Sequence, residues 1–159
     1  MFRMTLVLLL TAAAIAAGQK GWKTFEGAWF TIEYPREFVA RVSLKSATGI
    51  GAESVFFASP DGAVEFYVFS PQWSGEPVDI LLNERREKVV TRSEQQIDQY
   101  TVTLVTIADR GGRYTRSYRD IITENTRVVF GIKYRRAEDL VRFRPAFERF
   151  KKSLRQFAD

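Results

Sequence analysis

The chain has 159 residues, a length that suits one domain, and it carries 24 basic against 19 acidic side chains for a formal net charge of +5. It contains no cysteine and no histidine. Disulfides, thiolate nucleophiles, zinc–thiolate sites and histidine-dependent catalysis are therefore excluded. A hydrophobic content of 45% with 13 Phe indicates a packed globule.

The first 18 residues have the three parts of a secretory signal peptide. Arg3 supplies the positive charge, Thr5–Ile15 is an apolar run, and Ala16-Ala17-Gly18 supplies small residues for cleavage. The run is shorter than the roughly 20 residues of a transmembrane helix, and no cysteine follows it for a lipid anchor. We expect residues 19–159 to form one periplasmic or secreted domain that does not span a membrane; a short uncleaved anchor is the alternative.

The first half of that domain reads as strands, because apolar and polar residues alternate along it. The hairpin signal Pro60-Asp61-Gly62 joins two of them, since Pro fixes φ and Gly tolerates positive φ. The strands expected are Phe30–Tyr34, Val39–Lys45, Glu53–Ser59 and Ala63–Ser70.

Residues Pro77 to Lys88 predict a helix, because Pro suits a first helical position and Val78, Leu81 and Leu82 share a helical face. Val89–Gln96 fits either a continuation of that helix or a strand, and we favour the strand.

The second half predicts a three-stranded meander followed by a helix. Gly111-Gly112 and Glu124-Asn125 serve as turns between Tyr100–Ala108, Arg113–Thr123 and Thr126–Arg135. A closing helix is expected to start at Pro145, with an apolar stripe formed by Phe147, Phe150, Leu154 and Phe157.

This order of elements resembles the PsbP-like superfamily. The resemblance rests on Phe30–Pro35 followed by Phe38, on the central meander and on the closing Phe143–Phe157 segment. It implies a single-domain α+β fold in which an antiparallel sheet is packed between helices, an α/β/α sandwich. It implies an accessory or binding role rather than catalysis, and no functional residue of the family maps onto this chain.

Two-residue turns fix the register of the meander and so place side chains on its two faces. One face carries Val102, Leu104, Val128, Phe130 and Ile132, and we expect it to be core beneath the closing helix. The other face opposes Arg116 to Lys133, a like-charge pair that destabilises a sheet unless something intervenes. The candidate binding residues on and beside that face are Tyr114, Arg116, Tyr118, Lys133 and Arg135.

A cationic patch among aromatic rings suits a carboxylate, a phosphate or a glycan acid; the alternative is a solvated face with internal ion pairs. Residues 19–109 hold 9 basic and 13 acidic residues, whereas 110–159 hold 14 basic and 6 acidic ones. This asymmetry favours an acidic protein, a glycan or a membrane surface as partner. Trp73, in a turn-rich loop, is a further candidate binding residue, although it could simply cover the sheet edge.

We expect an exported, non-catalytic accessory or binding protein of the bacterial envelope or secreted space. The alternatives are a small-ligand carrier with a pocket between sheet and helix, and a carboxylate- or lysine-dependent enzyme. No cofactor is expected, no metal-ligand spacing joins Asp61, Asp109 and Asp120, and no nucleic-acid-binding signature is visible.

Overall fold

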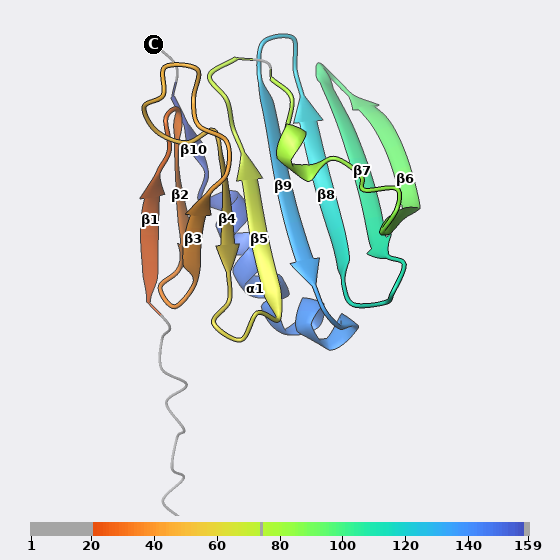
Figure 1. Cartoon of the computed structure of the whole chain (residues 1–159). Helices are drawn as coiled ribbons and strands as arrows, with labels where there is room; N and C mark the ends of the chain where they lie inside the picture. Colours follow the sequence, from red (N-terminus) through yellow and green to blue (C-terminus); the bar gives the residue numbers. More distant parts are fainter. Residues whose placement is uncertain (1–20, 74, 158–159) are drawn as a thin grey trace, which may run out of the picture.

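The computed structural model describes residues 21–73 and 75–157. The expected signal peptide, residues 1–18, lies outside the described residues. Seven strands form one antiparallel sheet in the order β3-β4-β5-β9-β8-β7-β6 (Figure 1). They are β3 (Val39–Val42), β4 (Ser54–Ala58), β5 (Val64–Phe69), β6 (Glu87–Ile97), β7 (Tyr100–Asp109), β8 (Thr115–Ile122) and β9 (Arg127–Tyr134).

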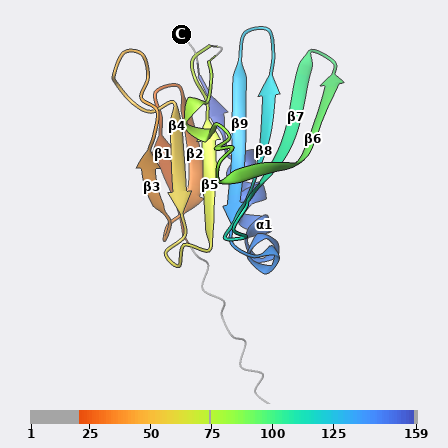
Figure 2. The same ribbon diagram turned by 45° about the vertical axis from the view of Figure 1, so that its right-hand side comes forward.

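A second layer packs on one face of this sheet. It consists of the helix α1 (Ala137–Lys152) and a small sheet in the order β1-β2-β10, formed by β1 (Trp22–Glu26), β2 (Phe30–Pro35) and β10 (Arg155–Gln156). Figure 1 shows α1 behind β5 and β9, while the segment that carries the short 3-10 helix η1 (Val78–Ile80) crosses in front of the sheet. The rotated view in Figure 2 shows the same arrangement. The α+β class is confirmed, with one α-helix among the described residues.

The main core lies between α1, β2 and the large sheet. Its fully buried side chains alternate along the strands, as a half-buried pleated surface requires. They surround Phe150, whose ring centroid lies 5.4 Å from that of Phe57 and 5.2 Å from that of Phe66. Phe147 and Phe150 of α1 and Leu154 just after it therefore face the core, as the spacing predicted, whereas Phe157 lies beyond the helix and is 49% exposed.

The predicted hairpin, meander and edge strand are confirmed. β4 pairs with β5 around Pro60-Asp61-Gly62, β8 pairs with both β7 and β9, and β6 forms the strand that we favoured over a longer helix. The strand expected over Val39–Lys45 ends earlier, at Val42, and Lys45 makes an isolated bridge to Ala52.

The helix expected over Pro77–Lys88 is wrong. Only Val78–Ile80 forms a 3-10 turn, and β6 already begins at Glu87. The apolar residues that suggested a helical face are not buried, since Leu81 is 71% exposed. The carbonyls of Ile80 and Leu81 accept hydrogen bonds from Arg116, a partner 35 or more residues away. A long-range contact therefore overrides the local pattern.

The expected start of the closing helix at Pro145 is also wrong, because α1 begins at Ala137 and contains Pro145. Proline supplies no N–H to the carbonyl four residues earlier, that of Val141. Both residues lie on the exposed side of α1, where water can hydrogen-bond that carbonyl. Glu138 and Asp139 in the first turn complement the helix dipole.

One expected core residue is not in the core. Leu104 of β7 is 46% exposed, whereas Val128, Phe130 and Ile132 of β9 are buried with Phe150. Leu104 is exposed because α1 contacts β2, β5 and β9 but does not extend over β7.

Phe150→Ala should lower the free energy of unfolding by about 3–5 kcal/mol, because it removes a fully buried ring from the centre of the core. Urea denaturation of the variant beside the parent measures the change. Val141→Ala on the exposed side of the same helix is the control and should change stability by less than about 0.5 kcal/mol. Equal effects of the two substitutions would contradict this assignment of the helix faces.

Candidate functional site

The register predicted for the meander is confirmed. Arg116 lies between Ile107 of β7 and Lys133 of β9, and Tyr118 lies between Val105 and Gly131. Gly131 is required there, because a Cβ at this position would collide with the Tyr118 ring. The expected opposition of two cations across β8 and β9 is therefore present.

The carboxylate of Glu87 neutralises one of these two opposed cations, Arg116. Arg116 is 7% exposed, and its guanidinium forms a two-bond ion pair with Glu87, with Nε to Oε1 at 2.8 Å and Nη2 to Oε2 at 2.7 Å. Its other N–H groups donate to the carbonyls of Ile80 and Leu81 and to the Tyr118 hydroxyl. All five guanidinium donors are thus used. Arg116 acts as a buried structural cation, which corrects its interpretation as a ligand-binding group.

Glu87 is equally saturated. Its oxygens accept hydrogen bonds from Arg116, from the backbone N–H of Asn83 and from the Tyr114 hydroxyl. Burial raises the pKa of Glu87, but the hydrogen bonds from Arg116, Asn83 and Tyr114 outweigh it and hold this pKa below its usual value. Burial and the hydrogen bond to Glu87 raise the pKa of Tyr114. The Tyr114 ring is therefore held in place as a neutral phenol.

Lys133 stands beside this ring without a counter-charge. Lys133 is half-buried as a residue, and its ammonium lies 4.6 Å from the Tyr114 ring centroid, a cation–π contact. Glu65 is its cross-strand neighbour on β5, but Glu65 makes its ion pair with Arg41 at 3.7 Å. Asp109 is held by two bonds from Arg113. Within residues 21–73 and 75–157, Lys133 makes no ion pair with a carboxylate.

Lys133 lies between two adjoining hollows, of about 310 Å³ and about 260 Å³, which share Glu65, Tyr114 and Lys133. We call them together the Lys133 cleft. Arg135 lines one hollow and Arg86 the other, and neither makes an ion pair with a described carboxylate. Three cations without a counter-charge thus line one concave surface.

The predicted site residues fall into three groups. Tyr114, Lys133 and Arg135 line the Lys133 cleft. Arg116 and Tyr118 lie on its floor with their polar groups engaged. Trp73 is 54% exposed and does not line either hollow of the cleft.

Sequence reasoning missed Glu87 and Arg86 because it placed both in a helix. The sequence held a weak indication of the position of Glu87. A strand pattern follows Glu87, and Arg116, which needs a counter-charge, comes 29 residues later. Nothing local in the sequence joins these two positions.

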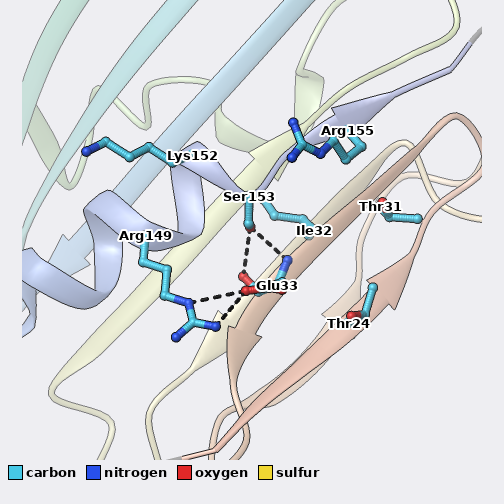
Figure 3. Close-up of a pocket in the computed structure, with 8 residues that line it drawn as sticks. All are labelled: Thr24, Thr31, Ile32, Glu33, Arg149, Lys152, Ser153 and Arg155. Carbon is cyan, nitrogen blue, oxygen red and sulfur yellow. Dashed lines mark hydrogen bonds and ion pairs between the residues drawn. The ribbon is translucent and has the colours of Figure 1, made fainter.

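A further hollow, of about 380 Å³, lies where α1 meets β1 and β2, and Figure 3 shows the residues that line it. Arg149 is turned onto Glu33, with Nη2 to Oε2 at 2.9 Å, and Ser153 accepts a hydrogen bond from the Glu33 N–H. Lys152 and Arg155 extend in other directions in Figure 3. These contacts fix α1 to β2, and the cationic groups do not converge on one point.

The space between α1 and the large sheet, where a ligand pocket was one expectation, is filled by rings. Phe66, Phe130 and Phe147 surround Phe150 with ring centroids 5.2–6.3 Å away. No group of three acidic side chains in the described part of the chain could hold a metal ion. No helix of that part is long and apolar enough to cross a membrane.

No protein-family model and no curated protein matches this chain. Solved structures do. The solution structure of cyanobacterial PsbP (CyanoP) from Synechocystis sp. PCC 6803 matches with a TM-score of 0.52 at 9% identity, over 89% of this chain and 96% of that one. A crystal structure from Bacteroides thetaiotaomicron VPI-5482 matches with a TM-score of 0.52 at 16% identity; the match spans 89% of this chain but half of that one. The chain therefore has the PsbP-like fold.

Glu87→Gln should lower the free energy of unfolding at pH 7 by about 3–5 kcal/mol, because it leaves the Arg116 charge buried without a counter-charge. The pKa of Glu87 is depressed in the folded state. The stability that ionised Glu87 contributes to the fold is therefore fully present above the unfolded pKa of about 4.3. It is lost as the pH falls through the lower pKa of the folded state. Urea denaturation at pH 7 and pH 3 should show a smaller pH dependence for the variant than for the parent.

Glu84→Gln, on an exposed residue of the same segment, is the matched control and should behave as the parent. Combining Glu87→Leu with Arg116→Met should recover part of the stability, because no buried charge then remains uncompensated. A Glu87→Gln variant as stable as Glu84→Gln would show that the pair does not hold the segment in place.

Proposed function

We propose that this protein is a non-catalytic accessory protein of the bacterial envelope or secreted space, and that its Lys133 cleft binds a carboxylate of an acidic partner protein. The observation that carries this proposal is half-buried Lys133, whose ammonium lies beside the Tyr114 ring without a carboxylate partner among the described residues. A charge in such a position interacts more strongly than one on an open surface, because fewer water molecules screen it.

The other charges of the cleft favour a single carboxylate over a densely charged surface. Arg86 and Arg135 add positive charge on either side of Lys133. Glu65, Asp79 and Glu87 line the same hollows and would repel a membrane surface or a glycan with many acidic groups. A single acidic side chain brings only one negative charge near these carboxylates, so it meets less repulsion than a surface with many acidic groups and can pair with Lys133.

The saturation of the buried cluster supports a non-catalytic role. Four donor groups already occupy the Glu87 carboxylate, so it has no free position from which to accept a substrate proton. Tyr114, with a raised pKa, is a poor proton donor near neutral pH. These two groups thus hold the segment before β6 in place and leave the cleft with its unpaired cations.

The proposed location rests on the sequence alone, on the charged, apolar and small-residue parts of 1–18. The fold is consistent with an accessory role. In this PsbP-like fold the candidate site is a cleft on the surface and not an enclosed pocket.

The experiment is an NMR titration of residues 19–159 with a short peptide, blocked at both ends, that carries a single glutamate. Backbone amide signals of Tyr114, Lys133 and Arg135 should shift and saturate for the parent. Lys133→Ser should weaken binding by roughly tenfold, the equivalent of about 1.4 kcal/mol. Binding should weaken for the parent between 0.01 M and 0.15 M salt, where the Debye length falls from about 30 Å to about 8 Å.

Lys88→Ser removes an exposed lysine elsewhere on the same sheet and should bind as the parent does. Lys133→Ser should change the free energy of unfolding by less than about 1 kcal/mol, because it removes one cation–π contact and relieves repulsion with Arg116. Equal affinities of the two lysine variants for the peptide would exclude the cleft as its binding site. Tighter binding to anionic lipid vesicles than to the peptide would assign the cleft to a membrane surface.

A further inference from the structure

β6 is the outermost strand at one edge of the large sheet, and one side of its backbone has no strand partner among the described residues. Figure 1 shows it at the end of the sheet, with β7 on one side and no strand on the other. It has 11 residues and contains neither proline nor glycine. Long, regular edges of this kind can pair with another strand unless the chain protects them.

The protection on this edge is partial. A β-bulge at Val90 interrupts the register between β6 and β7, but pairing is unbroken from Thr91 to Ile97. Exposed apolar side chains also gather on these two outer strands: Val89, Val90, Ile97, Tyr100 and Leu104 are each at least 39% exposed. The regular part of β6 is therefore open to a partner.

The charges on this stretch are arranged symmetrically about Ser93. Arg92 and Glu94 stand on either side of it and point to the same face of the sheet, opposite Val105 and Thr103 of β7. Arg92 makes no ion pair with any described residue. Glu94 accepts only a long hydrogen bond, 3.3 Å, from the Thr103 hydroxyl. Both charges are thus available to a neighbour across the edge.

We propose that β6 pairs antiparallel with β6 of a second copy of this chain, with a twofold axis at Ser93. In that register Arg92 of each copy stands directly opposite Glu94 of the other, on the same face, so two attractive pairs form at once. The two large sheets then join into one continuous sheet across the dimer.

The alternative registers support this choice. A slip by one residue would bring opposite faces of the two strands together. The two nearest slips that keep the faces matched would place Arg92 against Arg92 or Glu94 against Glu94, both like-charge pairs. Among these neighbouring registers the charge pattern favours the one centred on Ser93, and it does so for a copy of this same strand rather than for an arbitrary extended peptide.

Sedimentation velocity of residues 19–159 from about 10 µM to about 1 mM tests the proposal. The parent should form dimers as its concentration rises. Arg92→Glu alone and Glu94→Arg alone should each weaken the dimer by roughly 10–100-fold, because either change turns both attractive pairs into repulsive ones. The two changes in one chain should restore dimerisation, since the pairs are then reversed but complementary.

An equimolar mixture of the two single variants should form a heterodimer, because each variant supplies the charge that the other needs. Lys23→Glu, an exposed lysine on β1 of the small sheet, is the control: it should dimerise as the parent does and should not restore the mixture in place of Arg92→Glu. Thermal midpoints of all variants should match the parent, as the changed side chains are exposed.

A parent that stays monomeric to about 1 mM would overturn the proposal. So would a double variant that remains as weak as the single ones. A dimer that forms equally well in every charge variant would place the interface elsewhere on the molecule.

Discussion

The buried ion pair between Arg116 and Glu87 is the constraint on which the front face of the sheet depends. It joins Arg116, the second residue of β8, to the first residue of β6, and Arg116 also donates to the carbonyls of Ile80 and Leu81. Removing two charges from water is costly unless every donor and acceptor is satisfied, and here each one is. The segment across the sheet therefore has one position, which in turn orients Tyr114 and leaves Lys133 as the cation beside it.

Much of the fold follows from local rules in the sequence. The strands of the meander could be placed residue by residue because Gly111-Gly112 and Glu124-Asn125 set tight turns, and a period of two then fixes each face. The opposition of Arg116 to Lys133 came from this reasoning and is present. The burial of Phe150 followed equally from the helical spacing of the closing segment.

The rest depends on contacts that no local pattern encodes. Pro77–Lys88 has helical spacing, yet its carbonyls bind a guanidinium far along the chain, and this tertiary contact overrides a weak helical preference. The same contact turned Arg116 from an expected ligand group into a structural one. The cleft could therefore be located in part, through Tyr114, Lys133 and Arg135, while the acid that organises it could not.

Because the buried Arg116–Glu87 pair is fully hydrogen-bonded, it also restricts which substitutions evolution can accept at these two positions. A change at either position 87 or position 116 alone would remove a large share of the 5–15 kcal/mol that typically separates a folded domain from its unfolded chain. A lineage can therefore exchange this pair for another combination only through nearly simultaneous substitutions or after stability has risen elsewhere. In a set of homologues these two positions should covary, whereas position 133, whose lysine makes no ion pair among the described residues, is not tied to either of them.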